Sequence, residues 1–155
     1  MVLSWFPVVE PEHFGPPAFP PATYTGGPVF SAFPAVDGAT VKINFQRPQP
    51  RVTEPTDHHP YVEPGYARPW ASGVTGRLAG LEAGPVRVES YVEGYTVHRR
   101  GVVALAGVAP RVVTLGGFSG QGFKYAPAVG EIVADLVRTG HSRTPAFAGP
   151  VPAAG

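Results

Sequence analysis

Large apolar residues alternate with polar or small residues in several short stretches of the chain, as in "TVKINF", and this period of two is typical of half-buried β-strands. The stretches predicted to be strands are residues 2–6, 29–33, 40–45, 86–95, 102–105 and 111–115. Asp37 and Gly38 stand between the second and third of these stretches. Because an Asp-Gly pair is a strong turn signal, these two strands are predicted to form a hairpin.

A period of three to four residues predicts one strong helix over residues 123–137. Its apolar positions are Ala126, Val129, Ile132, Val133, Leu136 and Val137. Gly140 is a suitable stop signal for this helix. Residues 69–81 are a weaker helix candidate, because Gly73, Gly76 and Gly80 each cost about 1 kcal/mol relative to alanine.

Proline-rich stretches separate these elements. "PEHFGPPAFPPATYTGGP" and residues 46–65 are predicted to be extended loops, because proline removes a backbone donor and fixes φ. Residues 141–155 are predicted to be a flexible tail. The predicted fold class is α+β with a mostly antiparallel sheet. The last strand, glycine-rich loop and helix follow a βα pattern, so we expect them to lie in a different layer.

Composition narrows the function. The chain has 155 residues, a net charge of +1 and 15% charged residues, which predicts one domain without a nucleic-acid or membrane partner. Twenty prolines and twenty glycines indicate many loops, while 43% hydrophobic residues indicate a folded chain. The absence of cysteine excludes disulfides, thiolate catalysis and any cysteinyl link to a cofactor. Without a long apolar run or a basic leader, the expected location is cytoplasmic.

The glycine-rich stretch "GGFSGQGFK" carries the clearest chemical signal. Glycines let a backbone approach a partner closely, and the helix that follows offers free N–H groups with a partial positive charge. Lys124 adds a full positive charge in the first turn, so the loop suits an anionic group. The stretch is neither a P-loop nor a GxGxxG fingerprint. The alternative interpretation is a βα turn whose glycines serve packing alone.

The stretch "LGGFSGQGFKYAPAVGEIVADL" resembles the C-terminal flavin loop of the sarcosine oxidase-like amine oxidases, FAD-dependent oxidoreductases of the D-amino-acid-oxidase superfamily. The resemblance extends upstream to "LSWFPVVEPEHFGPPAFP", "FPAVDGATVKINF" and "LAGLEAGPVRVESYVEGYT". It implies that residues 1–110 are part of a substrate-binding sheet domain and that residues 111–140 return to the FAD-binding domain. Members of the family bind FAD through an N-terminal GxGxxG unit that this chain lacks. The chain therefore resembles a C-terminal portion, with a missing FAD-binding half or subunit as its partner.

The resemblance also implies roles for individual residues. Lys124 would bind a substrate carboxylate, and Lys42 would help dioxygen accept electrons from reduced flavin. The alternatives are a solvated lysine in a first helical turn and an outward-facing lysine on a hairpin strand. The loop residues that would contact non-covalent FAD are Gly117, Phe118, Ser119, Gly120, Gln121, Gly122, Phe123 and Lys124.

Four positions depart from the family pattern. Gln121 and Gln46 replace histidines, and neither can carry a titrating proton. Tyr91 stands at the position of the flavin-linking cysteine, so FAD would not be covalently bound. Glu93 replaces a tyrosine, and an anion there suits a cationic or amino-bearing substrate. A small amine or amino acid is therefore the expected substrate, with Glu93 and Gln121 among the residues that bind it.

Two broad functions stay open. The chain is either part of an FAD-dependent amine or amino-acid oxidoreductase, inactive by itself, or a non-catalytic α+β binding module or inactive remnant. No metal is expected, because His58 and His59 lie on a proline loop without a partner motif.

Overall fold

The structure is a computed structural model that describes residues 1–47, 49, 51–106 and 112–144. The chain folds as two compact units, a first unit of Met1–Val92 and a second unit of Glu93–Gly155. The expected division into a substrate-binding domain over residues 1–110 and an FAD-binding segment over residues 111–140 stays a prediction. Of the expected tail at residues 141–155, only residues 141–144 are among those described, and they form neither helix nor strand.

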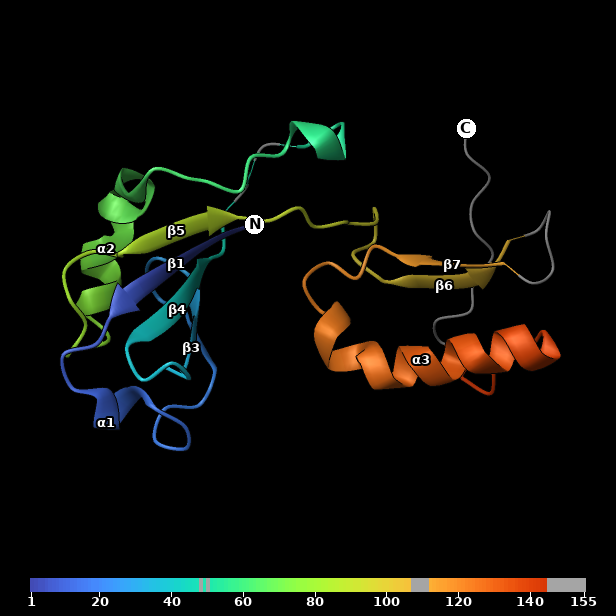
Figure 1. Cartoon of the computed structure of the whole chain (residues 1–155), viewed down its shortest axis with the longest axis horizontal. Helices are drawn as coiled ribbons and strands as arrows, with labels where there is room; N and C mark the ends of the chain where they lie inside the picture. The colour runs from blue at the N-terminus through green and yellow to red at the C-terminus, as the bar shows by residue number, and fades with distance from the viewer. Residues whose placement is uncertain (48, 50, 107–111, 145–155) are drawn as a thin grey trace. The chain divides into compact units, whose positions relative to one another are not determined.

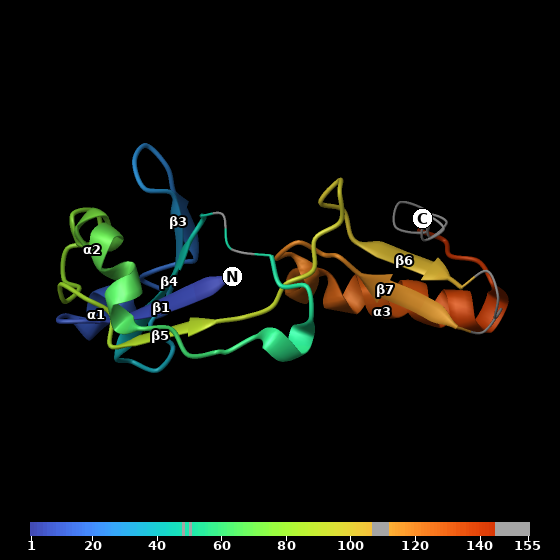
Figure 2. The same cartoon turned by 90° about the horizontal axis from the view of Figure 1, so that it is seen from above.

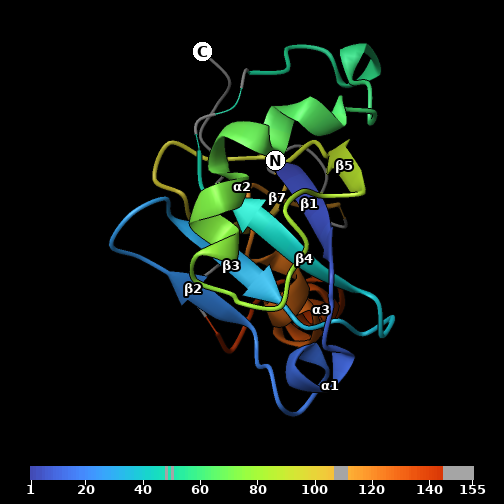
Figure 3. The ribbon, with the colours of Figure 1, turned by 90° about the vertical axis from the view of Figure 1, so that its left-hand side faces the viewer.

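The first unit is built on one antiparallel sheet in the order β2-β3-β4-β1-β5, which Figure 3 shows. Its strands are β1 (Val2–Pro7), β2 (Ala22–Tyr24), β3 (Phe30–Phe33), β4 (Thr40–Phe45) and β5 (Arg87–Ser90). All four pairings in this sheet are antiparallel. The predicted α+β class with a mostly antiparallel sheet is confirmed.

Alternation along the strands places one face of this sheet in the core. Phe6, Phe30, Val41 and Ile43 are completely buried, whereas their sequence neighbours Trp5 and Lys42 are half-buried on the opposite face. Helix α2 (Arg68–Thr75) adds Ala71 and Val74 to the same hydrophobic cluster, and helix α1 (Pro11–Phe14) adds Phe14. Two short 3-10 helices, η1 (Pro55–Asp57) and η2 (Pro64–Ala67), precede α2.

The predicted hairpin between β3 and β4 is confirmed. Asp37 Oδ1 accepts hydrogen bonds from the N–H groups of Ala39 at 2.9 Å and Thr40 at 2.8 Å, and Asp37 Oδ2 accepts one from the Thr40 hydroxyl at 2.6 Å. Gly38 has φ +71°, a left-handed conformation that glycine adopts without strain. These bonds lower the pKa of the Asp37 carboxyl, with the Thr40 hydroxyl as the largest cause.

Three expectations for the first unit were wrong in detail. The first proline-rich stretch contains α1 and β2, and β2 pairs with the edge of β3, where Tyr24 stacks on Phe30 at 4.9 Å. Strand β5 is shorter than the expected residues 86–95, because its neighbour β1 begins at Val2. Helix α2 ends at Thr75, before two glycines, rather than at residue 81.

The second unit packs one helix on a two-stranded antiparallel sheet (Figures 1 and 2). Its strands are β6 (Val102–Leu105) and β7 (Val113–Gly116), and its helix is α3 (Gly122–Thr139). The buried core consists of Val103, Val129, Ile132 and Leu136. The strong helix is thus confirmed, and Gly140 ends it with φ +75° and an N–H bond to the Leu136 carbonyl at 3.0 Å.

Candidate functional site

The glycine-rich loop leaves β7 and leads directly into α3. Gly117, Ser119 and Gly120 have φ values of +65°, +51° and +80°, so the chain turns sharply through three left-handed positions. The Ser119 hydroxyl donates to the Gly117 carbonyl at 3.1 Å, and the Gln121 N–H donates to the Phe118 carbonyl at 3.0 Å. The loop is therefore held by its own hydrogen bonds.

The extended segment of residues 93–96 supports the loop from one side. Tyr95 forms an antiparallel bridge with Phe118, and the Ser119 N–H donates to the Gly94 carbonyl at 3.2 Å. A Cβ atom on Gly117 would lie 2.4 Å from Thr96 Cγ2, which is too close for two carbon atoms. Packing against this segment therefore requires the glycine at position 117.

Glu93 lies directly against the loop. The Tyr95 hydroxyl donates to Glu93 Oε2 at 2.9 Å, and a Cβ atom on Gly120 would lie 3.1 Å from Glu93 Oε1. This hydrogen bond is the largest of the causes that raise the pKa of the Tyr95 phenol. Within the described residues, no cationic side chain lies within 4.0 Å of the Glu93 carboxylate. A negative charge thus stands beside the glycine-rich loop.

The sequence did not point to Tyr95. The signal was available, since residues two apart in an extended segment share a face and a phenol there can reach the Glu93 carboxylate.

The start of α3 places a positive charge directly after the loop. Gln121 is the N-cap residue, but its side chain caps no backbone N–H, and the first turn contains no acidic residue. The Lys124 side chain is exposed, with Nζ 5.7 Å from the centroid of the Tyr125 ring. The Tyr125 hydroxyl makes a long contact of 3.5 Å to Gln121 Oε1. Phe123 is 96% exposed, so it takes no part in the core of the second unit.

Lys42 belongs to the first unit. Its Nζ lies 4.6 Å above the centroid of the Phe33 ring, on the half-buried face of the sheet opposite the core. Gln46, which the resemblance implies stands in place of a histidine, donates from Nε2 to the Ser31 hydroxyl at 3.3 Å. The structure therefore places Lys42 on a partly open surface.

Tyr91, directly after β5, belongs to a short chain of polar contacts with two residues of that strand. Its hydroxyl donates to Glu89 Oε2, and Arg87 Nε donates to Glu89 Oε1 at 2.7 Å. The Arg87 hydrogen bond is the largest cause that lowers the pKa of the Glu89 carboxyl, and the bond to Glu89 raises the pKa of the Tyr91 phenol. Glu89 thus joins the side chains of Arg87 and Tyr91 through two hydrogen bonds.

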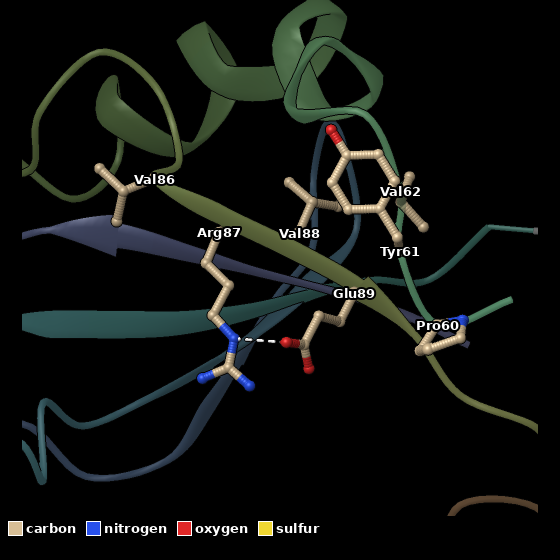
Figure 4. A pocket seen from close by; sticks show the side chains of 7 residues that line it. All are labelled: Pro60, Tyr61, Val62, Val86, Arg87, Val88 and Glu89. Atoms are coloured by element: carbon tan, nitrogen blue, oxygen red, sulfur yellow. Dashed lines mark hydrogen bonds and ion pairs between the residues drawn. The ribbon is translucent and has the colours of Figure 1, made fainter.

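Figure 4 shows a hollow of about 300 Å³ beside β5. Pro60, Tyr61, Val62, Val86, Arg87, Val88 and Glu89 line it. Its lining is mainly apolar, and it contains none of the residues singled out in the sequence. His58 lies close by, where its Nε2 is 3.0 Å from the Ser90 hydroxyl. In the described part of the chain, no three histidine or carboxylate side chains come together as metal ligands.

Among the helices of the described residues, none has the length and apolarity needed to cross a bilayer.

The sequence and the fold of the chain are similar to parts of two known oxidases. No protein-family model matches the sequence. The chain is 30% identical over 158 residues to monomeric sarcosine oxidase from Streptomyces avermitilis, a match that covers 93% of the chain and 39% of that protein. Its fold is similar to NikD, an unusual amino acid oxidase essential for nikkomycin biosynthesis, in the open form. That likeness has a TM-score of 0.68 at 17% identity and covers 93% of this chain and 39% of NikD.

These matches confirm the resemblance that the loop sequence predicted. The chain has partial homology to monomeric sarcosine oxidase, and its fold corresponds to part of the structure of the amino acid oxidase NikD. It spans 39% of the length of the sarcosine oxidase that it matches.

Proposed function

We propose that the chain is part of a flavin-dependent amine or amino-acid oxidoreductase. In this reaction the substrate CH–NH group would become C=N by losing a hydride from carbon to FAD and a proton from nitrogen. Dioxygen would then take up the two electrons and two protons and leave as hydrogen peroxide. The observation that carries the proposal is a left-handed glycine-rich loop at an uncapped helix N-terminus, with Lys124 in the first turn, in a chain homologous to part of a sarcosine oxidase.

The loop fits a flavin. Helix α3 begins without an acidic residue or a side-chain cap, so its first N–H groups and its dipole favour an anionic edge. A Cβ atom on Gly116 would meet nothing within 4 Å, so the loop is open at that position. FAD, when bound, supplies the two-electron acceptor. Residues 117–124 would hold FAD without a covalent bond, because the chain contains no cysteine. Tyr91, at the expected attachment position, instead donates a hydrogen bond to Glu89.

Charged and polar side chains would bind the substrate and support the reduction of dioxygen. Lys124 binds the substrate carboxylate, since an ammonium group beside a helix N-terminus attracts anions. Glu93, fixed by the Tyr95 hydroxyl, holds the substrate amine, and Gln121 contributes a hydrogen bond. Lys42 offsets the negative charge that dioxygen gains as it is reduced. Lys42 is half-buried above the Phe33 ring and makes no ion pair with a described residue, which leaves its charge available for this role.

The partner that this proposal requires is a nucleotide-binding half. The second unit leaves several large apolar side chains exposed, and exposed apolar surface is a common mark of an interface. They include Val97 at 93%, Val112 at 51%, Leu115 at 53%, Phe123 at 96% and Val137 at 50%. We expect the chain alone to show no turnover, since it carries no fingerprint for the FAD pyrophosphate.

The test is to purify the chain alone and together with the polypeptide encoded directly upstream, with and without added FAD. The expected result is the visible absorption of oxidised flavin in the combined preparation, and a weaker band after Gly120→Val, which crowds the Glu93 carboxylate. Absence of a flavin band from every combination would contradict the proposal and favour the alternative, a non-catalytic α+β binding module.

A further inference from the structure

Four side chains form a row across four strands on the half-buried face of the five-stranded sheet. Lys42 on β4 is paired with Phe33 on β3 and with Trp5 on β1, and Trp5 is paired with Arg87 on β5. Directly paired residues in an antiparallel sheet project to the same face. We call these four residues, Phe33, Lys42, Trp5 and Arg87, the cationic row.

The two cations of this row lie over its two aromatic rings. Lys42 Nζ is 4.6 Å from the centroid of Phe33, and Arg87 Cζ is 4.3 Å from the centroid of Trp5. Both distances are in the range of cation–π contacts, which hold a long charged side chain over the ring. The aromatic rings thus form a floor, and the charged groups form the outer layer.

Arg87 is also held from the side. Its Nε–H donates to Glu89 Oε1 at 2.7 Å, and the other oxygen of Glu89 accepts the Tyr91 hydroxyl. This bond uses one of the five N–H donors of the guanidinium. Figure 4 shows the guanidinium extended away from the strand, beside the Glu89 carboxylate.

The charges of this face leave one positive charge in excess. Glu89 offsets Arg87, whereas among the described residues no carboxylate lies within 4.0 Å of Lys42 Nζ. A single negative charge complements this arrangement. A dianion would carry one negative charge without a positive partner, and the Glu89 carboxylate would repel it.

We propose that the cationic row binds a small monocarboxylate, whose oxygen atoms contact the Lys42 ammonium and the Arg87 guanidinium. Adjacent strands lie about 4.8 Å apart, so the backbones of Lys42 and Arg87, with β1 between them, are about 10 Å apart. To contact both, the carboxylate draws the Lys42 ammonium from the Phe33 ring toward Trp5, while Arg87 stays over the Trp5 ring. This inference goes beyond the proposed function, because the binding needs neither flavin nor dioxygen.

The experiment uses the 155-residue chain and the proton NMR line widths of phenylacetate, a monocarboxylate, with 2-phenylethanol as its neutral counterpart. The proton lines of phenylacetate are expected to broaden when the protein is added, and those of 2-phenylethanol are not. Lys42→Gln and Arg87→Gln should each weaken phenylacetate binding about three- to tenfold, the range for one partly exposed charged contact. The charge-retaining variants Lys42→Arg and Arg87→Lys should keep most of it.

Arg47→Gln is the matched control. Arg47 Cζ lies 4.1 Å over the Trp70 ring, the same kind of contact in the same unit but outside the cationic row. This variant should bind phenylacetate like the original chain. Equal broadening by phenylacetate and 2-phenylethanol, or equal losses in Arg47→Gln and Arg87→Gln, would overturn the proposal. So would unchanged binding in both glutamine variants of the row.

Discussion

The close contact between the glycine-rich loop and Thr96 predicts a large cost for Gly117→Ala. Position 117 has φ +65°, and placing an L residue there costs about 1–2 kcal/mol. The added Cβ would also lie 2.4 Å from Thr96 Cγ2, so one group must move, at an overpacking cost of about 1–3 kcal/mol. The expected total is about 2–5 kcal/mol.

Gly140→Ala is the matched control in the same unit. Gly140 has a similar φ of +75°, but a Cβ atom there would meet nothing within 4 Å. This substitution should therefore cost only the backbone part, about 1–2 kcal/mol. Thr96→Ser removes Cγ2 and keeps the hydroxyl that donates to the Arg100 carbonyl at 2.8 Å. In a Thr96→Ser background, Gly117→Ala should cost no more than Gly140→Ala.

Urea unfolding can separate the two units. Both tryptophans, Trp5 and Trp70, lie in the first unit, whereas the longest helix, α3 with 18 residues, lies in the second. Gly117→Ala should lower the midpoint of the far-ultraviolet helical signal and leave tryptophan fluorescence unchanged. Equal midpoints for the two alanine variants, or no relief by Thr96→Ser, would refute the reasoning.

Three further predictions concern single side chains. Asp37→Asn should destabilise the first unit by about 1 kcal/mol at neutral pH. Because folding lowers the pKa of Asp37, this contribution is present above the unfolded carboxyl pKa and is lost as pH falls through the folded value. The stability difference should therefore shrink below about pH 4, measured by tryptophan fluorescence. Ser4 is fully buried, and its hydroxyl has no partner among the described residues, so Ser4→Ala should stabilise the same unit by about 1 kcal/mol, whereas Ser31→Ala should not. Leu136→Ala should lower the free energy of unfolding of the second unit by about 2–5 kcal/mol, measured by urea unfolding of the far-ultraviolet helical signal. Val137 is half-exposed, so Val137→Ala should lower it much less.

Local patterns accounted for much of the candidate site. The glycine-rich loop, the helix behind it and the position of Lys124 in the first turn all follow from periodicity and turn chemistry within about thirty consecutive residues. The contact of Glu93 and Tyr95 with the loop did not follow. It joins segments more than twenty residues apart, and no local rule fixes which extended segment lies beside a loop.

By itself, the sequence determined which face of β1, β3 and β4 is buried, where the hairpin turns and where α3 ends, because side-chain alternation, an Asp-Gly pair and a glycine C-cap act on neighbouring residues. Only the tertiary structure decided that β2 forms inside a proline-rich stretch and that β6 pairs with β7. It also placed Lys42, Trp5 and Arg87 in one row. Strand order and register depend on contacts between distant segments, whose hydrogen bonds form only when the chain has folded.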